Sequence, residues 1–195
     1  MVNTGKELID ICQKRNIKIW EYTVEQEVKL TGKSRKEIFN NMKKNFAVMK
    51  NSAEYGIQHR VKSVSGLIGG DAYKLGEYCG REKTLTGTFM VKAMARALSC
   101  SEINAAMGKI VASPTAGSCG IIPAVIITAG EKLNKNEDEL IQSLFTASGV
   151  GILIAKNATM AGAEGGCQAE CGSASAMASA AVVEMMGGTP EQALN

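Results

Sequence analysis

Small side chains dominate the last third of the sequence, since most residues from Ala161 to Gly188 are Ala, Gly or Ser. Helices built from such residues can pack with their backbones close together. A sheet would instead need long stretches of alternating β-branched and polar residues, which the sequence lacks. The run from Ile121 to Ile127 is strand-like, but its Pro123 fits better in the first turn of a helix. We therefore predict an all-α fold: a compact helical domain with glycine-rich loops between its helices.

Start signals indicate where the first helices lie. Ser34 and Glu37 have the spacing of a capping box, and the apolar pattern after them should continue as a helix to about Tyr55. Residues 23–26 carry a weaker version of the same signal. Asp71 is placed to cap a short helix after a glycine-rich stretch.

Periodicity and one more start signal predict the later helices. Apolar patterns cover residues 88–98 and 137–154, and the small residues after Ala161 favour further helices. Thr189-Pro190-Glu191-Gln192 has an N-cap residue, Pro at N1 and Gln at N3, yet only three residues follow it. We expect from this that the chain is truncated at its C-terminus; a frayed tail is the alternative.

The charge is unevenly distributed along the chain. Residues 1–62 hold 13 Lys and Arg against 7 Asp and Glu, whereas the remainder holds 9 against 12. The glycine-rich stretch at 63–71 is the best candidate boundary. We therefore predict a basic N-terminal helical arm over 1–62 and a second helical domain over 63–195. A basic region of this kind is more often a solvated face or a contact with an acidic subunit than a nucleic-acid site, so no nucleic acid is expected.

Composition excludes several classes of protein. An apolar fraction of 45% against 21% charged residues rules out a disordered chain. Six cysteines in 195 residues are too sparse for a disulfide scaffold, and no signal peptide is recognised at the N-terminus, so we expect free thiols and a cytoplasmic protein. The uncharged interval from Leu140 to Ala155 has 16 residues, fewer than the roughly 18 that a spanning helix needs, so no membrane segment is expected.

The first candidate site is the loop from Ser113 to Gly120, which runs into an apolar helix. Glycines, hydroxyls and the free amides of a helix N-terminus together favour binding of a carboxylate or phosphate. A tight turn between helices is the plain alternative. Neither glycine-rich nucleotide fingerprint is present.

The second candidate site is the stretch from Ala161 to Gly172, which contains Cys167 and Cys171. A thiolate between glycines suits a metal or cluster ligand or a nucleophile, although free cysteines are often just small buried residues. The single histidine, His59, is far away in sequence, which disfavours a zinc site and a cysteine hydrolase. No pyridoxal phosphate is expected, because Lys74 and Lys156, the amines considered, lie outside any convincing motif.

Four blocks of the sequence match one known family in the same order. They are residues 64–72 (VSGLIGGDA), 102–108 (EINAAMG), 111–123 (VASPTAGSCGIIP) and 163–170 (AEGGCQAE). With these blocks, nearly the whole chain resembles the α chain of the bacterial iron–sulfur-dependent L-serine dehydratases, also called L-serine ammonia-lyases.

The resemblance implies a [4Fe–4S] cluster held by three cysteines, with one iron free to polarise the β-hydroxyl of L-serine while a base removes the Cα proton. The aminoacrylate so formed would give pyruvate and ammonia. Cys167 matches the first of the three ligands. The other two lie in a Cys-Asp-Pro…Pro-Cys segment that this sequence does not contain. The 63–195 region is thus expected to be an incomplete catalytic domain, inactive alone, whose catalytic base is unassigned.

Substrate and partners also follow from the resemblance. Thr115, Gly117 and Ser118 are expected to bind the substrate carboxylate, and Cys167 the iron of the cluster. The expected partner is a β chain carrying a Ser-His-Thr segment, within a homo- or hetero-oligomer. Two alternatives stay open: a non-catalytic helical scaffold or regulatory subunit, and a related iron–sulfur hydro-lyase acting on another small hydroxy acid.

Overall fold

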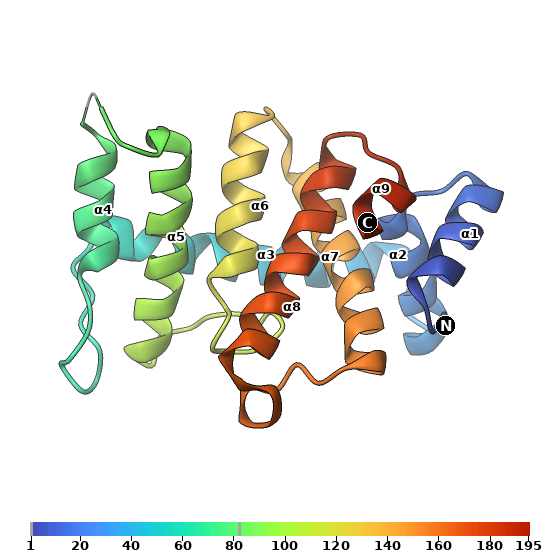
Figure 1. Cartoon of the computed structure of the whole chain (residues 1–195), viewed down its shortest axis with the longest axis horizontal. Helices are drawn as coiled ribbons and strands as arrows, with labels where there is room; N and C mark the ends of the chain where they lie inside the picture. Colours follow the sequence, from blue (N-terminus) through green and yellow to red (C-terminus); the bar gives the residue numbers. More distant parts are fainter. Residues whose placement is uncertain (1, 82) are drawn as a thin grey trace.

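The computed structural model describes residues 2–81 and 83–195, and every regular element in this part of the chain is a helix. The prediction of an all-α fold is confirmed. Several helices stand in a row with α1, α2 and α9 at one end (Figure 1). The helices are α1 (Gly5–Arg15), α2 (Ile19–Thr31), α3 (Arg35–Gln58), α4 (Asp71–Cys79), α5 (Gly87–Ala105), α6 (Ile121–Lys132), α7 (Glu137–Asn157), α8 (Gly162–Met185) and α9 (Pro190–Leu194).

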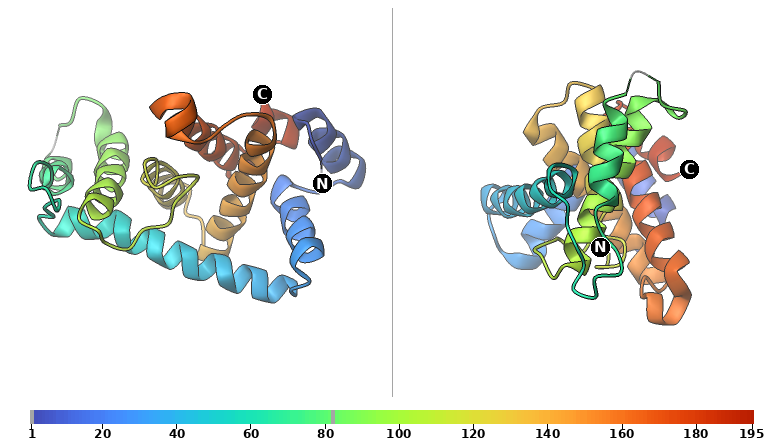
Figure 2. Two further views of the ribbon diagram at one scale, coloured as in Figure 1. Left: turned by 90° about the horizontal axis from the view of Figure 1, so that it is seen from below. Right: turned by 90° about the vertical axis from the view of Figure 1, so that its left-hand side faces the viewer.

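Helix α3 runs across the base of this row and contacts α2, α4, α5, α6 and α7 (Figure 2). The predicted capping box is present: the Ser34 amide donates to Glu37 Oε2 at 2.9 Å, and the Glu37 amide donates to Ser34 Oγ at 3.3 Å. The helix continues past Tyr55 to Gln58. Since α3 packs on helices from both sides of residue 62, it ties the two predicted regions together, and their division at that residue stays a prediction.

Two start signals were read incorrectly from the sequence. Residues 23–26 lie inside α2, where the Thr23 hydroxyl donates to the carbonyl of Ile19 at 2.9 Å and caps nothing. Asp71 is the first residue of α4, and the N-cap is Gly70, whose φ of +81° suits glycine. Besides their local N-cap residues, Lys18 and Gly70, both helices are held at their start by side chains from elsewhere in the chain.

These distant side chains are two buried glutamates. Glu184 of α8 accepts hydrogen bonds from the amides of Ile19 at 2.8 Å and Trp20 at 3.3 Å, which open α2. Glu102 of α5 accepts from the amides of Asp71 at 2.6 Å and Ala72 at 3.1 Å, which open α4. A carboxylate at a helix N-terminus satisfies free amides and the positive end of the helix dipole. Each glutamate therefore fixes the start of a helix that is distant in sequence.

The core lies between α3, α6, α7 and α8. Pro123 occupies the first turn of α6 and is buried with its neighbours, as predicted. Among the described residues, α7 alone is long and apolar enough to cross a membrane by length and composition. Ile141, Leu144 and Phe145 of this helix are buried in the core, as is usual for the central helix of a folded domain.

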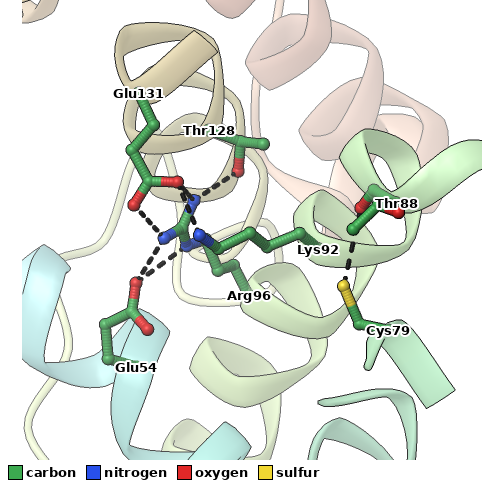
Figure 3. Close-up of polar contacts among 7 residues, drawn as sticks. All are labelled: Glu54, Cys79, Thr88, Lys92, Arg96, Thr128 and Glu131. Carbon is green, nitrogen blue, oxygen red and sulfur yellow. Dashed lines mark hydrogen bonds and ion pairs between the residues drawn. The ribbon is translucent and has the colours of Figure 1, made fainter. Parts of the chain in front are cut away.

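Arg96 of α5 is the largest fully buried side chain, and it joins three helices (Figure 3). Its Nε donates to Glu54 Oε1 of α3 at 2.8 Å, and its Nη1 donates to Thr128 Oγ1 of α6 at 2.9 Å. Both terminal nitrogens also bond to the carboxylate of Glu131. Lys92 reaches the same carboxylate at 2.8 Å from the solvent side. This ion-pair cluster fixes α5 against α3 and α6.

Candidate functional site

The loop from Ser113 to Gly120 lies directly before α6 and is held by its own hydroxyls. The Thr115 amide donates to Ser118 Oγ at 3.4 Å, and the two hydroxyls lie 3.1 Å apart. Asn104, at the end of α5, donates from Nδ2 to the carbonyl of Ala116 at 3.1 Å. The loop also approaches α5 closely, because a Cβ added at Gly120 would lie 2.3 Å from the carbonyl oxygen of Ala97. The conformation of the loop is therefore fixed by hydrogen bonds and by its close packing on α5.

The loop offers free hydrogen-bond donors. Within the described residues, the amides of Ala116, Gly117 and Ser118 donate no hydrogen bond to the chain. Consecutive free amides in a turn can bind an anion. That this loop does so stays a prediction.

The second block forms the start of α8, which is broken at Gly166. This glycine has φ 72° and ψ 178°, and helical geometry resumes with Cys167. Cys167 is exposed and Cys171 is half-buried, and their sulfur atoms are 3.7 Å apart, one helical turn from each other. The two thiols therefore share one face of the helix.

Glu170 joins the two blocks. The Thr115 hydroxyl donates to Glu170 Oε1 at 2.7 Å. A Cβ added at Gly117 would lie 2.9 Å from Glu170 Oε2, and one added at Gly162 would lie 2.6 Å from the same atom. A side chain at either position would displace the Glu170 carboxylate from its place between the loop and the start of α8. Cys167 precedes Glu170 by three residues, which are neighbouring positions on the surface of a helix.

Glu170 is the site residue that sequence reasoning missed. It lies inside the block AEGGCQAE, but it was given no role there. No cation lies within ion-pair distance of its carboxylate in the described part of the chain. A half-buried carboxylate beside free amides thus presents both an acceptor and donors to a ligand. The signal in the sequence was the acidic residue one turn after Cys167.

The other four cysteines lie in different surroundings. Burial raises the pKa of Cys12 to about 11 and that of Cys100 to about 12. Burial also raises the pKa of Cys119, whose Sγ donates to the carbonyl of Cys100 at 3.8 Å. Cys79 donates to the carbonyl of Thr88 at 3.6 Å (Figure 3). A buried, protonated thiol is a poor metal ligand, so its burial disfavours Cys119 in that role.

The thiols present do not make a complete metal site. Among residues 2–81 and 83–195, no group of three or more His, Cys, Asp or Glu side chains is arranged to hold a metal ion. Cys167 and Cys171 together supply two thiols, whereas the [4Fe–4S] cluster that the resemblance implies takes three cysteines. These 195 residues therefore do not fit such a cluster by themselves.

The remaining candidate side chains are engaged away from the loop. His59 is exposed and stacks on Tyr55 with ring centroids 4.3 Å apart. Lys74 pairs with Asp71 at 2.9 Å, and Lys156 donates to the carbonyl of Val2 at 2.7 Å. None of the three has a described contact with the loop or with the start of α8.

These features together define a helical protein with a small polar site between a glycine-rich loop and a broken helix. The family model described as "Serine dehydratase alpha chain" matches residues 14–195. The chain belongs to this family.

Relatives match along the whole chain. The L-serine dehydratase, alpha chain, of Peptoniphilus asaccharolyticus is 48% identical over 195 residues, which are 100% of this chain and 67% of that protein. The probable L-serine dehydratase, alpha chain, of Bacillus subtilis is 46% identical over 192 residues, which cover 98% of this chain and 64% of the relative. L-serine dehydratase 2 of Escherichia coli is 32% identical over 200 residues, covering 97% of this chain and 42% of that protein. The chain thus spans about two thirds of the two alpha chains.

Proposed function

We propose that this chain is the α-chain part of an L-serine ammonia-lyase, which removes water from L-serine and yields pyruvate and ammonia, in the cytoplasm. Family membership and the names of the relatives support the reaction class. The observation that carries the proposal for the site is the bond from Thr115 to Glu170. It brings together the two blocks of sequence that would each bind one part of the substrate.

The site offers both charges that an α-amino acid needs. The free amides of Ala116, Gly117 and Ser118 suit the substrate carboxylate. The Glu170 carboxylate, which has no cationic partner among the described residues, suits the ammonium group. The Thr115 hydroxyl donates its hydrogen bond to Glu170, so Thr115 positions the loop. Gly117 leaves room for the Glu170 carboxylate.

The Glu170 carboxylate favours an amino acid over the alternative class of substrate. A 2-hydroxy acid carries a neutral hydroxyl where serine carries an ammonium group, so it offers no positive charge to the Glu170 carboxylate. L-Serine is therefore the better match. The scaffold alternative has no need of free amides or of an unpaired carboxylate.

Cys167 is proposed as one ligand of a [4Fe–4S] cluster, with the remaining ligands supplied from outside these 195 residues. The exposure of Cys167 and its place one turn from Glu170 support this assignment. A β chain is proposed as the partner, because the relatives are named alpha chains. The proton-abstracting base is not assigned to this chain.

The test is an anaerobic iron–sulfur reconstitution of the chain at the full length of its relatives, mixed with its β chain. We expect a thiolate-to-iron charge-transfer band and pyruvate from L-serine, with no product from glycerate, the matched hydroxy acid. Cys167→Ala should abolish the band, whereas Cys119→Ser should keep it. Glu170→Gln should raise KM for L-serine more than it lowers kcat. Absence of both the band and pyruvate from the unaltered chain would contradict the proposed reaction.

A further inference from the structure

The thiols of Cys167 and Cys171 form a pair that the proposed reaction does not use as a pair. Their sulfur atoms are 3.7 Å apart, in contact but unbonded. Cys167 is exposed, so a small oxidant can reach it from solvent, and Cys171 lies half-buried beside it.

The helical turn that carries the two cysteines can change its backbone conformation. Side chains four apart on a helix have Cβ atoms about 5–6 Å apart, whereas a disulfide needs roughly 3.5–4.5 Å. Bonding therefore requires the turn from 167 to 171 to loosen. Gly166, with its non-helical φ of 72°, already breaks the helix immediately before this turn, and Gly172 follows it directly. A turn at the end of a helical run loosens at much lower cost than a turn in its middle.

We infer that Cys167 and Cys171 form a reversible disulfide when the chain holds no cluster and meets hydrogen peroxide. Peroxide oxidises the Cys167 thiolate to a sulfenic acid, its O–O bond breaks, and the second oxygen leaves as water. The Cys171 thiolate then attacks the oxidised sulfur, the S–S bond forms, and the hydroxyl leaves as a second water. In sum, two thiols and one peroxide give one disulfide and two waters.

The disulfide has two consequences. Because the turn must loosen to close it, the bond is strained and is easily reduced again by a thiol. Oxidation also protects Cys167 from the irreversible sulfinic and sulfonic acids, since the sulfenic acid is consumed at once. While oxidised, Cys167 cannot bind iron; this last point rests on the proposed function, whereas formation of the disulfide does not.

The experiment uses the 195-residue chain itself, purified with reductant and stripped of metal by a chelator. After brief treatment with equimolar hydrogen peroxide, the chain is unfolded and alkylated, and its intact mass and peptides are measured. We expect two fewer alkylated thiols, a mass lower by two hydrogens before alkylation, and one peptide with an internal bridge from Cys167 to Cys171. Dithiothreitol should restore both thiols.

Two variants make the result decisive. Cys171→Ser should lose the bridge and accumulate Cys167 sulfenic acid, trapped by dimedone, whereas the matched control Cys79→Ser should keep the bridge. Circular dichroism of each variant checks that it is folded. If both thiols of the unaltered chain stay alkylatable, or if Cys167 bonds to another cysteine or to a second molecule, the inference is wrong. Because the readout needs no cluster, this outcome is distinguishable from failure of the proposed function.

Discussion

Replacing Arg96 by Met tests whether the buried ion-pair cluster holds α3, α5 and α6 together. Met fills much of the volume of Arg, so the change removes the charge and the hydrogen bonds with little cavity. Breaking a buried ion pair by deleting one partner costs about 3–5 kcal/mol. Here the side chains of Glu54 and Glu131 are 30% and 46% exposed, so they regain water and the cost falls to about 2 kcal/mol.

The loss of the Thr128 hydrogen bond adds a smaller cost to the free energy of unfolding. Its hydroxyl is buried and accepts from Arg96 Nη1, and an unsatisfied buried hydroxyl costs roughly 1 kcal/mol. The total is about 3 kcal/mol. For a chain of this size, roughly 2–4 °C of melting temperature corresponds to 1 kcal/mol, so we expect Arg96→Met to melt about 6–12 °C lower at pH 7. Thermal unfolding followed by circular dichroism measures this.

The pKa of Glu131 determines how the effect of Arg96→Met on the melting temperature changes with pH. Burial alone would raise the pKa of Glu131, but the hydrogen bonds from Arg96 and Lys92 outweigh it and hold this pKa below its ordinary value of 4.5. A carboxyl with a lowered pKa stabilises the fold above its unfolded pKa and stops doing so as the pH falls through its folded pKa. The difference in melting temperature between the unaltered chain and Arg96→Met should therefore shrink below about pH 4.5.

The matched control is Lys92→Met. The Lys92 side chain is 43% exposed and pairs with the same carboxylate, and exposed ion pairs contribute about 0–1 kcal/mol. It should change the melting temperature by at most about 4 °C. If Arg96→Met melts within about 2 °C of the unaltered chain at pH 7, or if the difference grows on acidification, the cluster does not have the role described.

Two other substitutions test the long-range contacts. Glu184→Ala removes the acceptor of the Ile19 and Trp20 amides and of the Thr146 hydroxyl. It should lower the free energy of unfolding, measured by urea titration, by about 2–4 kcal/mol. Glu184→Gln should lower it by less, and equal losses for the two variants would contradict the role of Glu184 at the start of α2. Gly162→Ala places a Cβ 2.6 Å from Glu170 Oε2 and should cut pyruvate formation by the reconstituted enzyme several-fold, whereas Gly172→Ala, whose Cβ meets only the flexible end of Gln168, should keep the rate. Equal rates for the two alanine variants would show that Glu170 does not need its glycine cradle.

The sequence predicts those parts of the fold whose signals are local. Ser34 and Glu37 lie three residues apart and form the capping box themselves. Pro123 indicates the first turn of α6. The start of α2 also depends on a distant acceptor, because Glu184 lies 165 residues from Ile19. Such a contact exists only after the helices have packed, so no local pattern reveals it.

The same limit applies to the candidate site. The glycines and hydroxyls of the loop and the thiols of the second block were recognisable as unusual, because their composition departs from that of an ordinary helix or turn. Their connection was not recognisable, since Thr115 and Glu170 are 55 residues apart. The break at Gly166 was also missed, because a run of small residues is compatible with an unbroken helix.

The central claim is that the loop at 113–120 and the start of α8 form one site through Thr115 and Glu170. A double-mutant cycle of Thr115→Val and Glu170→Gln, read from urea unfolding of the 195-residue chain, tests it most directly. A hydrogen bond to a charged group contributes about 1.5–3 kcal/mol, and the partial exposure of Glu170 reduces this, so we predict a coupling of about 1 kcal/mol. Losses that add within about 0.3 kcal/mol would mean that the two blocks do not interact, and would contradict the claim.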